Sequence, residues 1–321
     1  MVRRLLPRIP LSRLYQALRE GDIRVNGSRV APAARTRPAD TIWVHAALAR
    51  DAAPPRQRPD RDRGAWRETG ATPPVLYRGG GILAVAKPAG VAVHGDGDSV
   101  MSRLRRELPL RHAALSFAPA PVHQLDRITS GVLVIAERLE AARQWSLALR
   151  SGQVLKLYLA VVAGTALPDP AGTTWTDSLR YDRRQRRTRA DDDGRAARTR
   201  VWELARTGAD LPAILLLLQL LTGRRHQIRS QAALRGHPLL GDARYGAADP
   251  AGSQPLLHAA AIRNDRQGPA VPIVAPLPSA AGLALDRRFG GGTARRAEAA
   301  VQRHLRQTAA NGVGPRAATG S

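Results

Sequence analysis

One carboxylate of this chain lies in a polar loop that has the features of a reaction centre. Asp126 belongs to the polar loop HQLDRITSG, residues 123–131, which directly precedes the apolar run VLVIA, residues 132–136. The apolar run predicts a buried strand, so the loop is held at the end of a rigid element. A carboxylate in such a place can act as a nucleophile or a base when a cation keeps it ionised. Asp126 is therefore the candidate nucleophile.

A cation for this carboxylate is available in the segment TGRRHQIR, residues 222–229. An arginine beside an aspartate lowers the pKa of the carboxyl group and fixes its orientation. Arg224 and Arg229 are the two candidates for this pairing. The segment runs into HQIRSQAALRG, residues 226–236, whose pattern and closing glycine predict a helix.

The elements that must position these residues form an α+β pattern over residues 75–286, the predicted catalytic domain. Short β-rich runs predict strands: ILAVA (82–86), VLVIA, LYLAVVA (157–163), RVWELA (200–205) and ILLLLQLL (214–221). A second helix is predicted in ERLEAARQWSLALRSG, residues 137–152. A few helices among many short strands indicate a mostly antiparallel, mixed sheet.

The N-terminal part predicts a separate, smaller module over residues 8–48. LSRLYQALREGD is expected to form a helix that ends at Gly21, followed by two runs that flank an Asn26-Gly27 turn and by a strand in DTIWVHA. Residues 49–74 are rich in Pro, Arg and Asp with little apolar periodicity, so they predict a linker.

The chain is strongly basic. Its 321 residues include 50 Lys+Arg and 26 Asp+Glu, which gives a formal net charge of +24. Such a surplus repels itself unless a polyanion binds, so nucleic acid is the first partner to consider; the alternative is a compositional bias toward Arg and Ala. The two lysines that escape the arginine excess, Lys87 and Lys156, lie in AVAKPAG and KLYLAVV, where an ammonium group serves better than a guanidinium.

Two further stretches are rich in charge. Residues 181–200, YDRRQRRTRADDDGRAARTR, are too charged for a core and predict a protruding hairpin, which either contacts RNA or serves solubility alone. Residues 287–321 carry glycines and basic residues with few large apolar side chains. They predict a basic, disordered tail with one short helix near residues 294–305.

Several classes of protein are excluded by what the sequence lacks. It has no cysteine, which excludes disulfides, thiolate zinc sites and cysteine nucleophiles. No apolar run is long enough for a membrane span or a signal peptide, so the expected location is the cytoplasm. HGDGDS, residues 94–99, lacks the spacing of a calcium loop, and the glycines at 79–81 lack the Gly-Lys-Ser/Thr of a phosphate loop.

Four motifs, in the expected order, resemble the RluA-type pseudouridine synthases. They are ILAVAKPAGVAVHG (82–95), HQLDRITSG, KLYLAVVAG (156–164) and LLTGRRHQIRSQAALRGHPLLGDARYG (220–246). They are similar to the family's K-P-x-G-x-x-x-H turn, its H-R-L-D-x-x-T-S-G loop, its K-x-Y segment, and its T-G-R-x-H-Q-I-R and G-H-P-I-x-G-D-x-x-Y-G pattern. The resemblance covers roughly residues 82–262. It implies an isomerase that converts uridine in RNA to pseudouridine.

The resemblance also implies the roles of individual residues. The bond from the sugar to the ring nitrogen of uracil breaks and is remade to carbon five, without redox change, so no metal and no organic cofactor is expected. The residues expected to be catalytic are Asp126, Tyr158, which would stack on the base and take part in proton removal at carbon five, and Arg229, which the family favours over Arg224. Whether Asp126 attacks the anomeric carbon or removes a sugar proton stays open. The residues expected to bind the substrate are His123, Gln124, Arg127, Thr129, Lys156, Arg224 and His226.

One position departs from the family's pattern. The residue two before the aspartate, usually Arg, is Gln124, so a cation that helps to hold a flipped-out uridine is missing unless Arg127 replaces it. This departure supports the alternative function, a non-catalytic RNA-binding or ribosome-assembly factor that retains the fold. Asp126, Tyr158 and Arg229 argue against that alternative.

The N-terminal module resembles the small RNA-binding module named after ribosomal small-subunit protein S-four. The similarity is good over residues 11–27, while Ala39-Asp40 replaces the usual Gly-Asp. It implies binding to phosphates. Because family members with this module commonly modify large-subunit ribosomal RNA, that RNA is the expected substrate, and transfer RNA stays open. The expected partner is RNA, without a membrane or a small-molecule cofactor, and the expected state is a monomer.

Overall fold

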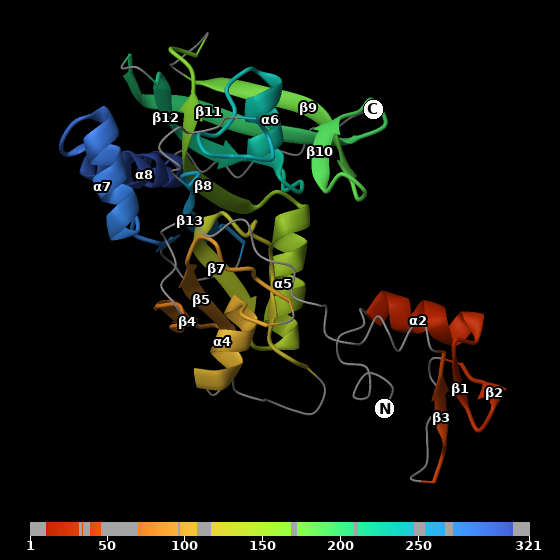
Figure 1. Cartoon of the computed structure of the whole chain (residues 1–321). Coiled ribbons are helices and arrows are strands. Elements are labelled where there is room, and N and C mark those ends of the chain that lie inside the picture. The colour runs from red at the N-terminus through yellow and green to blue at the C-terminus, as the bar shows by residue number, and fades with distance from the viewer. Residues whose placement is uncertain are drawn as a thin grey trace. The chain divides into compact units, whose positions relative to one another are not determined.

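The computed structural model describes residues 11–31, 34, 39–45, 70–95, 97–107, 117–167, 172–208, 211–246, 254–266 and 272–310. The chain divides into two compact units, Met1–Arg61 and Asp62–Ser321 (Figure 1). Most of the predicted linker, residues 49–74, lies outside the described residues. No helix in the described part of the chain is both long and apolar enough to cross a membrane.

The small unit is a helix packed on a three-stranded sheet. It consists of α2 (Leu11–Glu20), β1 (Ile23–Val25), β2 (Ser28–Arg29) and β3 (Ile42–Val44), with antiparallel strands in the order β2-β1-β3. Its core contains Leu14 and Leu18 of the helix and Ile23 of β1. Asn26 and Gly27 both have positive φ, of 51° and 79°, which is the backbone of a tight hairpin turn. The predicted helix and turn are therefore present.

The large unit is built on an 11-stranded sheet. Its strands are β4 (Val75–Gly79), β5 (Ile82–Lys87), β6 (Ala120–Pro121), β7 (Ser130–Ala136), β8 (Val154–Ala163), β9 (Thr173–Asp182), β10 (Arg187–Ala190), β11 (Arg195–Thr207), β12 (Ala213–Leu220), β13 (Leu257–Asn264) and β14 (Ile273–Val274). The main path is β10-β9-β11-β12-β8-β13-β7-β5-β4, with β14 beside β13 and β6 beside β7. The pair β13–β7 is parallel, and the other neighbouring pairs are antiparallel. The predicted α+β fold with a mostly antiparallel sheet is confirmed.

Helices pack against both faces of this sheet. They are α4 (Val100–Glu107), α5 (Leu139–Arg150), α6 (Gln227–Leu234), α7 (Ser279–Phe289) and α8 (Thr293–Ala310). Figure 1 shows α6 over β9, with α7 and α8 beside β11 and β12. Along β8 alternate residues enter different cores: Tyr158 belongs to the same core as Ile228 of α6, and Leu157 belongs to the same core as Leu305 of α8. This period of two places Tyr158 on the α6 face.

The C-terminal region corrects one prediction. Residues 287–310, expected to belong to a disordered tail with one short helix near residues 294–305, complete α7 and form α8. The predicted helix is present, but it is longer, with 18 residues; residues 311–321 lie outside the described residues. Four apolar side chains of α8 are buried, Ala297, Ala300, Val301 and Leu305, and all but Ala300 share a core with residues of the sheet. They repeat at helical spacing. Small side chains let a helix lie close to the strands, so few large apolar residues were needed.

The charged stretch 181–200 is also better integrated than a protruding hairpin. It forms the end of β9, all of β10 and the beginning of β11, and β11 pairs with both β9 and β12. Ala197 and Thr199 are fully buried, while Arg198 and Arg200 between and beyond them are exposed. A strand needs only one apolar face, so the arginines occupy the other.

The loop that carries Asp126 enters β7 at a close approach of two backbones. Ser130 and Gly131 pair with His258 and Ala259 of the parallel strand β13. Gly131 has a φ of 109°, and a β-carbon there would collide with the backbone of Ala259, so only glycine fits. The hydroxyl of Ser130 lies 2.9 Å from Nδ1 of His258. The base of the loop is therefore fixed by a strand that comes much later in the chain.

Candidate active site

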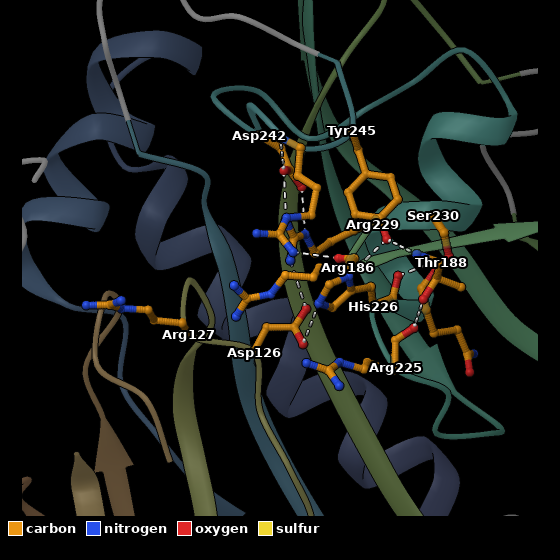
Figure 2. Close-up of polar contacts among 12 residues, drawn as sticks. Asp126, Arg127, Arg186, Thr188, Arg225, His226, Arg229, Ser230, Asp242 and Tyr245 are labelled. Carbon is orange, nitrogen blue, oxygen red and sulfur yellow. Dashed lines mark hydrogen bonds and ion pairs between the residues drawn. The ribbon is translucent and has the colours of Figure 1, made fainter. Parts of the chain in front are cut away.

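Asp126 lies at the centre of a group of polar side chains (Figure 2). Its Oδ2 accepts a hydrogen bond from Nη1 of Arg229 at 3.3 Å, and its Oδ1 lies 3.7 Å from Nε2 of His226. Its backbone carbonyl accepts a hydrogen bond from the amide of Thr129 at 3.0 Å, which closes the turn of the loop. Asp126 and Arg229 are 103 residues apart in the sequence, so the packing of α6 against the sheet brings them together.

The guanidinium of Arg229 is shared between two carboxylates. Nε and Nη2 donate to the two carboxylate oxygens of Asp242 at 2.7 and 2.8 Å, and Nη1 is left for Asp126. Burial alone would lower the pKa of Arg229, but the hydrogen bonds and charges of Asp242 and Asp126 raise it above its ordinary value. Arg229 is therefore charged at any working pH.

The other candidate partner, Arg224, has a different contact. Its Nε donates to the backbone carbonyl of Ala196 at 2.8 Å. Of the two arginines, Arg229 is thus the one that makes the ion pair with Asp126. The two arginines have different contacts because Arg229 lies within α6 on its buried side, whereas Arg224 precedes the helix.

His226 sits at the start of α6 in a backbone conformation that is unusual for its type. Its φ is 52°, a left-handed conformation that non-glycine residues adopt at an energetic cost. Nδ1 lies 2.9 Å from the hydroxyl of Tyr245, which accepts a hydrogen bond from the amide of Thr188 at 2.7 Å. In the tautomer that carries the ring proton on Nε2, this hydroxyl donates to Nδ1 and the N–H of the ring lies toward Asp126. Burial lowers the pKa of His226 to about 4, so the ring is neutral at neutral pH.

Tyr158 contributes a buried phenol from β8 to the same site. Burial, and then the charge of Asp126, raises the pKa of Tyr158 above its ordinary value. The hydroxyl therefore keeps its proton at neutral pH. In this state Tyr158 can donate a hydrogen bond and offer its ring, but it is a poor base.

The other expected substrate-binding residues have their own partners around the site. Nε2 of His123 accepts a hydrogen bond from the amide of Val134 at 3.1 Å, and Nζ of Lys156 donates to the carbonyl of Thr222 at 3.3 Å. Burial lowers the pKa of His123 to about 4 and that of Lys156 to about 8.

Gln124 and Arg127, which lie close to Asp126 in the sequence, differ in their surroundings. Arg127 is held away from the carboxylate, since its Nε donates to the carbonyl of Gly90 at 2.8 Å, and Figure 2 shows its side chain pointing outward. Gln124 is exposed. Arg127 therefore does not occupy the place of the cation that Gln124 lacks.

Lys87 lies beneath the Asp126 loop, although it was absent from the expected site residues. Its Nζ donates to the backbone carbonyls of Pro88, Val91 and Arg127 at 2.8, 2.6 and 3.2 Å. Burial lowers the pKa of Lys87 to about 7, against the opposing charge of Asp126. The KPAG motif was the signal that could have included it.

Asp242 and Tyr245 were likewise missed as site residues. Both belong to the GDARYG end of the fourth motif, which follows α6 and folds back over Arg229 and His226. Their pattern was visible in the sequence, but their contacts depend on that return of the chain. Thr188, from the charged stretch, had no comparable signal.

Known proteins resemble this chain in sequence and in fold. Residues 81–234 match the family described as RNA pseudouridylate synthase. The chain is 32% identical over 248 residues to ribosomal large subunit pseudouridine synthase D of Xylella fastidiosa, which covers 75% of this chain and 69% of that protein. It is 30% identical over 246 residues to ribosomal large subunit pseudouridine synthase C of Escherichia coli K12, with coverage of 74% and 72%.

The solved structures agree with the sequence comparison. Human RNA Pseudouridylate Synthase Domain Containing 1 superposes with a TM-score of 0.56 at 24% identity, over 66% of this chain and 86% of that one. The domain that holds Asp126, Arg229 and Asp242 thus has the fold of these enzymes. By its sequence similarity, the chain belongs to the RNA pseudouridylate synthase family.

Proposed function

We propose that this protein isomerises uridine to pseudouridine in large-subunit ribosomal RNA, with Asp126 as the residue that acts on the sugar. The observation that carries the proposal is the ion pair between Asp126 and Arg229, whose guanidinium is itself fixed by Asp242. The names of the relatives in Xylella fastidiosa and Escherichia coli support the choice of this RNA.

The proposed chemistry needs an ionised carboxylate at a fixed angle. The bond between the sugar and the ring nitrogen breaks, the uracil turns, and a bond from the sugar to carbon five forms. Carbon five loses one proton and the ring nitrogen gains one, so the reaction balances without any other reactant. Arg229 keeps Asp126 charged through its positive field. Asp126 then either attacks the anomeric carbon or removes a sugar proton.

Tyr158 and His226 complete the proposed pocket. The ring of Tyr158 offers a flat surface for the detached uracil, and its protonated hydroxyl can donate to a base oxygen or to Asp126. The proton of carbon five must then go to another acceptor, because the pKa of Tyr158 is raised. Neutral His226 borders the pocket on the side of the second carboxylate oxygen, with Nε2 3.7 Å from Asp126.

The small unit is proposed to bind RNA as well. In the register of its sheet, Arg24 lies between Arg29 and Trp43. Trp43 is 50% exposed, and the guanidinium carbon of Arg24 lies 5.9 Å from the centre of its ring. An exposed aromatic ring among cations suits unpaired bases and phosphates. We further propose that the protein is a monomer and that it meets its RNA substrate in the cytoplasm.

The experiment that tests the proposal is a map of pseudouridine in ribosomal and transfer RNA from cells with and without this protein. We expect one or more large-subunit positions to lose the modification. Wild-type protein should restore it, and protein with Asp126→Asn should not. Loss of pseudouridine from transfer RNA instead would identify transfer RNA as the substrate. Unchanged maps together with a defect in ribosome assembly would favour the non-catalytic factor.

A further inference from the structure

A stacked pair of side chains leads from the active site to the surface. The guanidinium carbon of Arg225 lies 4.0 Å from the centre of the Tyr181 ring. Tyr181 meets the ring of His226 edge-on, with centroids 5.7 Å apart and planes at 89°. His226 in turn lies 3.7 Å from Asp126. These contacts connect Asp126 to His226, His226 to Tyr181, and Tyr181 to Arg225.

This pair is held in place by the edge of the sheet. Thr188 of β10 donates from its hydroxyl to the backbone carbonyl of Arg225 at 2.8 Å and from its amide to the hydroxyl of Tyr245 at 2.7 Å. Tyr181 lies at the end of β9, which is hydrogen-bonded to β10. Two strands and the start of α6 therefore fix the backbone of both residues before any RNA arrives, which limits the ordering that is required on binding.

The outer part of the pair is available to a ligand. Arg225 is exposed, and within the described ranges no carboxylate lies near enough to form an ion pair with it. Its guanidinium plane thus covers Tyr181 on one side and leaves the rest open to solvent. The proposed chemistry uses neither side chain, and Arg225 occupies the unspecified position of the T-G-R-x-H-Q-I-R pattern. The pair therefore presents an exposed cation over an aromatic ring, as a binding site would, and no ligand has been assigned to it.

We propose that Arg225 stacked on Tyr181 is a platform for the base of a nucleotide next to the target uridine, an inference that rests on the proposed function. A uridine that is flipped toward Asp126 leaves its neighbours in the strand without stacking partners. Guanidinium planes and aromatic rings stack unpaired bases, and a cation at the same place attracts the adjoining phosphate. A neighbouring base that rests on Arg225 recovers part of the stacking energy that flipping costs.

Binding of a short RNA measures this contact directly. The probe is the single-stranded pentamer AAUAA, and the protein is the full chain with Asp126→Asn, so that no turnover occurs. Two further pentamers each lack one base, the first at the second position and the other at the fourth position. Arg225→Ala should weaken binding of the intact pentamer about 5- to 150-fold, which is the range of one stacked base. On one of the two abasic pentamers it should weaken binding less than about twofold, because the base that would stack on Arg225 is already absent.

Other substitutions separate stacking from charge. Tyr181→Phe keeps the ring and should bind like the parent, whereas Tyr181→Leu should approach the effect of Arg225→Ala. Arg225→Lys keeps the charge without the plane and should also behave like Arg225→Ala. The matched control is Arg200→Ala, an exposed arginine of β11 whose neighbours Thr199 and Val201 face the other side of the strand. Full affinity of Arg225→Lys would overturn the stacking proposal in favour of a phosphate contact.

Turnover distinguishes failure of this inference from failure of the proposed function. Wild-type chain is assayed for pseudouridine formation in transcripts of large-subunit ribosomal RNA. Equal weakening by Arg225→Ala on all three pentamers, or no weakening on any, would overturn the platform even if pseudouridine forms. Dependence on one neighbouring base without any pseudouridine would retain the platform and overturn the proposed function.

Discussion

Arg229 makes its two-point ion pair with Asp242 and reaches Asp126 with a single nitrogen. The distances are 2.7 and 2.8 Å to Asp242 against 3.3 Å to Asp126. Asp242 is only 2% exposed, so it acts as the fixed partner that orients the guanidinium. Asp126 contacts Arg229 through Oδ2 alone, so its Oδ1, 3.7 Å from Nε2 of His226, is not engaged by the guanidinium.

Asp242→Asn should therefore lower turnover while Asp126 itself is intact. The amide cannot neutralise Arg229, so the guanidinium is drawn toward Asp126 and its angle changes. We expect kcat to fall about 10- to 100-fold, the range for loss of a supporting carboxylate, with a smaller change in KM. Asp242→Ala should in addition lower the free energy of unfolding by about 3–5 kcal/mol, because a buried charge loses its partner. Unchanged kcat for Asp242→Asn would show that Asp242 has no positioning role.

Asp126→Asn should abolish product formation while the fold and the affinity for RNA stay nearly intact. The amide has the same shape, but it is neither nucleophilic nor basic. Pseudouridine formation in a single-turnover assay, with thermal melting as the control for folding, measures this. Residual turnover above about 1% of wild type, a barrier change below ~2.7 kcal/mol, would contradict the catalytic assignment.

Acid should destabilise the protein through its buried histidines. Burial lowers the pKa values of His123 and His226 to about 4, from 6.5 in the unfolded chain. Between pH 6.5 and 4 the unfolded chain binds more protons than the folded one, so the free energy of unfolding falls as the pH falls through this window. Between pH 7 and 5 each histidine contributes a loss of about 1–2 kcal/mol.

Urea denaturation at pH 7, 6 and 5 checks this prediction. The His226→Gln variant should lose less stability on acidification than wild type, by the contribution of one histidine. Parallel pH dependences of the two proteins would mean that His226 titrates in the folded state as it does in the unfolded chain.

Removal of the small unit should change affinity without changing the chemical step. If residues 1–48 bind phosphates, their deletion should flatten the plot of log Kd against log salt by about 0.7 for each phosphate that the shortened protein no longer binds. Turnover on a short oligonucleotide that the large unit alone can hold should not change. A salt slope equal to that of the full chain would leave the small unit without a role in RNA binding.

Gln124→Arg tests the departure from the family's pattern. Gln124 is exposed beside Asp126, and Arg127 is tied to Gly90, so a new guanidinium has a place to act. Activity on structured RNA should rise roughly ten- to hundredfold, since a charge-assisted hydrogen bond contributes ~1.5–3 kcal/mol. An unstructured oligonucleotide needs no flipping from a helix and should gain much less. Equal gains on both RNAs would show that position 124 does not govern flipping, and a loss on the native target would mark Gln124 as a reader of that site.

The sequence was most informative where a short, continuous stretch of residues determines the structure. The strand at residues 132–136 and the helix at 137–152 follow from apolar periodicity, and β7 and α5 cover most of both ranges. The loop of Asp126 and the segment of Arg229 could be recognised because their motifs are continuous in sequence. Which arginine pairs with Asp126 was decided by the direction of α6, which a linear motif does not contain.

The missed features depend on packing between distant segments. Asp242 contacts Arg229 only because the turn after α6 folds back toward that helix. Lys87 becomes part of the site because three backbone carbonyls surround its ammonium group. For α8 the sequence did predict a short helix near residues 294–305, within Thr293–Ala310 of the structure. Its burial against the sheet was missed, because a buried alanine is hard to distinguish from an exposed one without the facing strands.

The parallel contact of Gly131 with Ala259 has a consequence for the order of synthesis. β13 lies between β8 and β7, so the floor beneath Asp126 is incomplete until about 130 more residues have left the ribosome. An unfinished chain can display the Asp126 loop and even Arg229, yet it lacks the strand that clamps the loop. The loop of Asp126 therefore gains its supporting strand only after β13 has been synthesised.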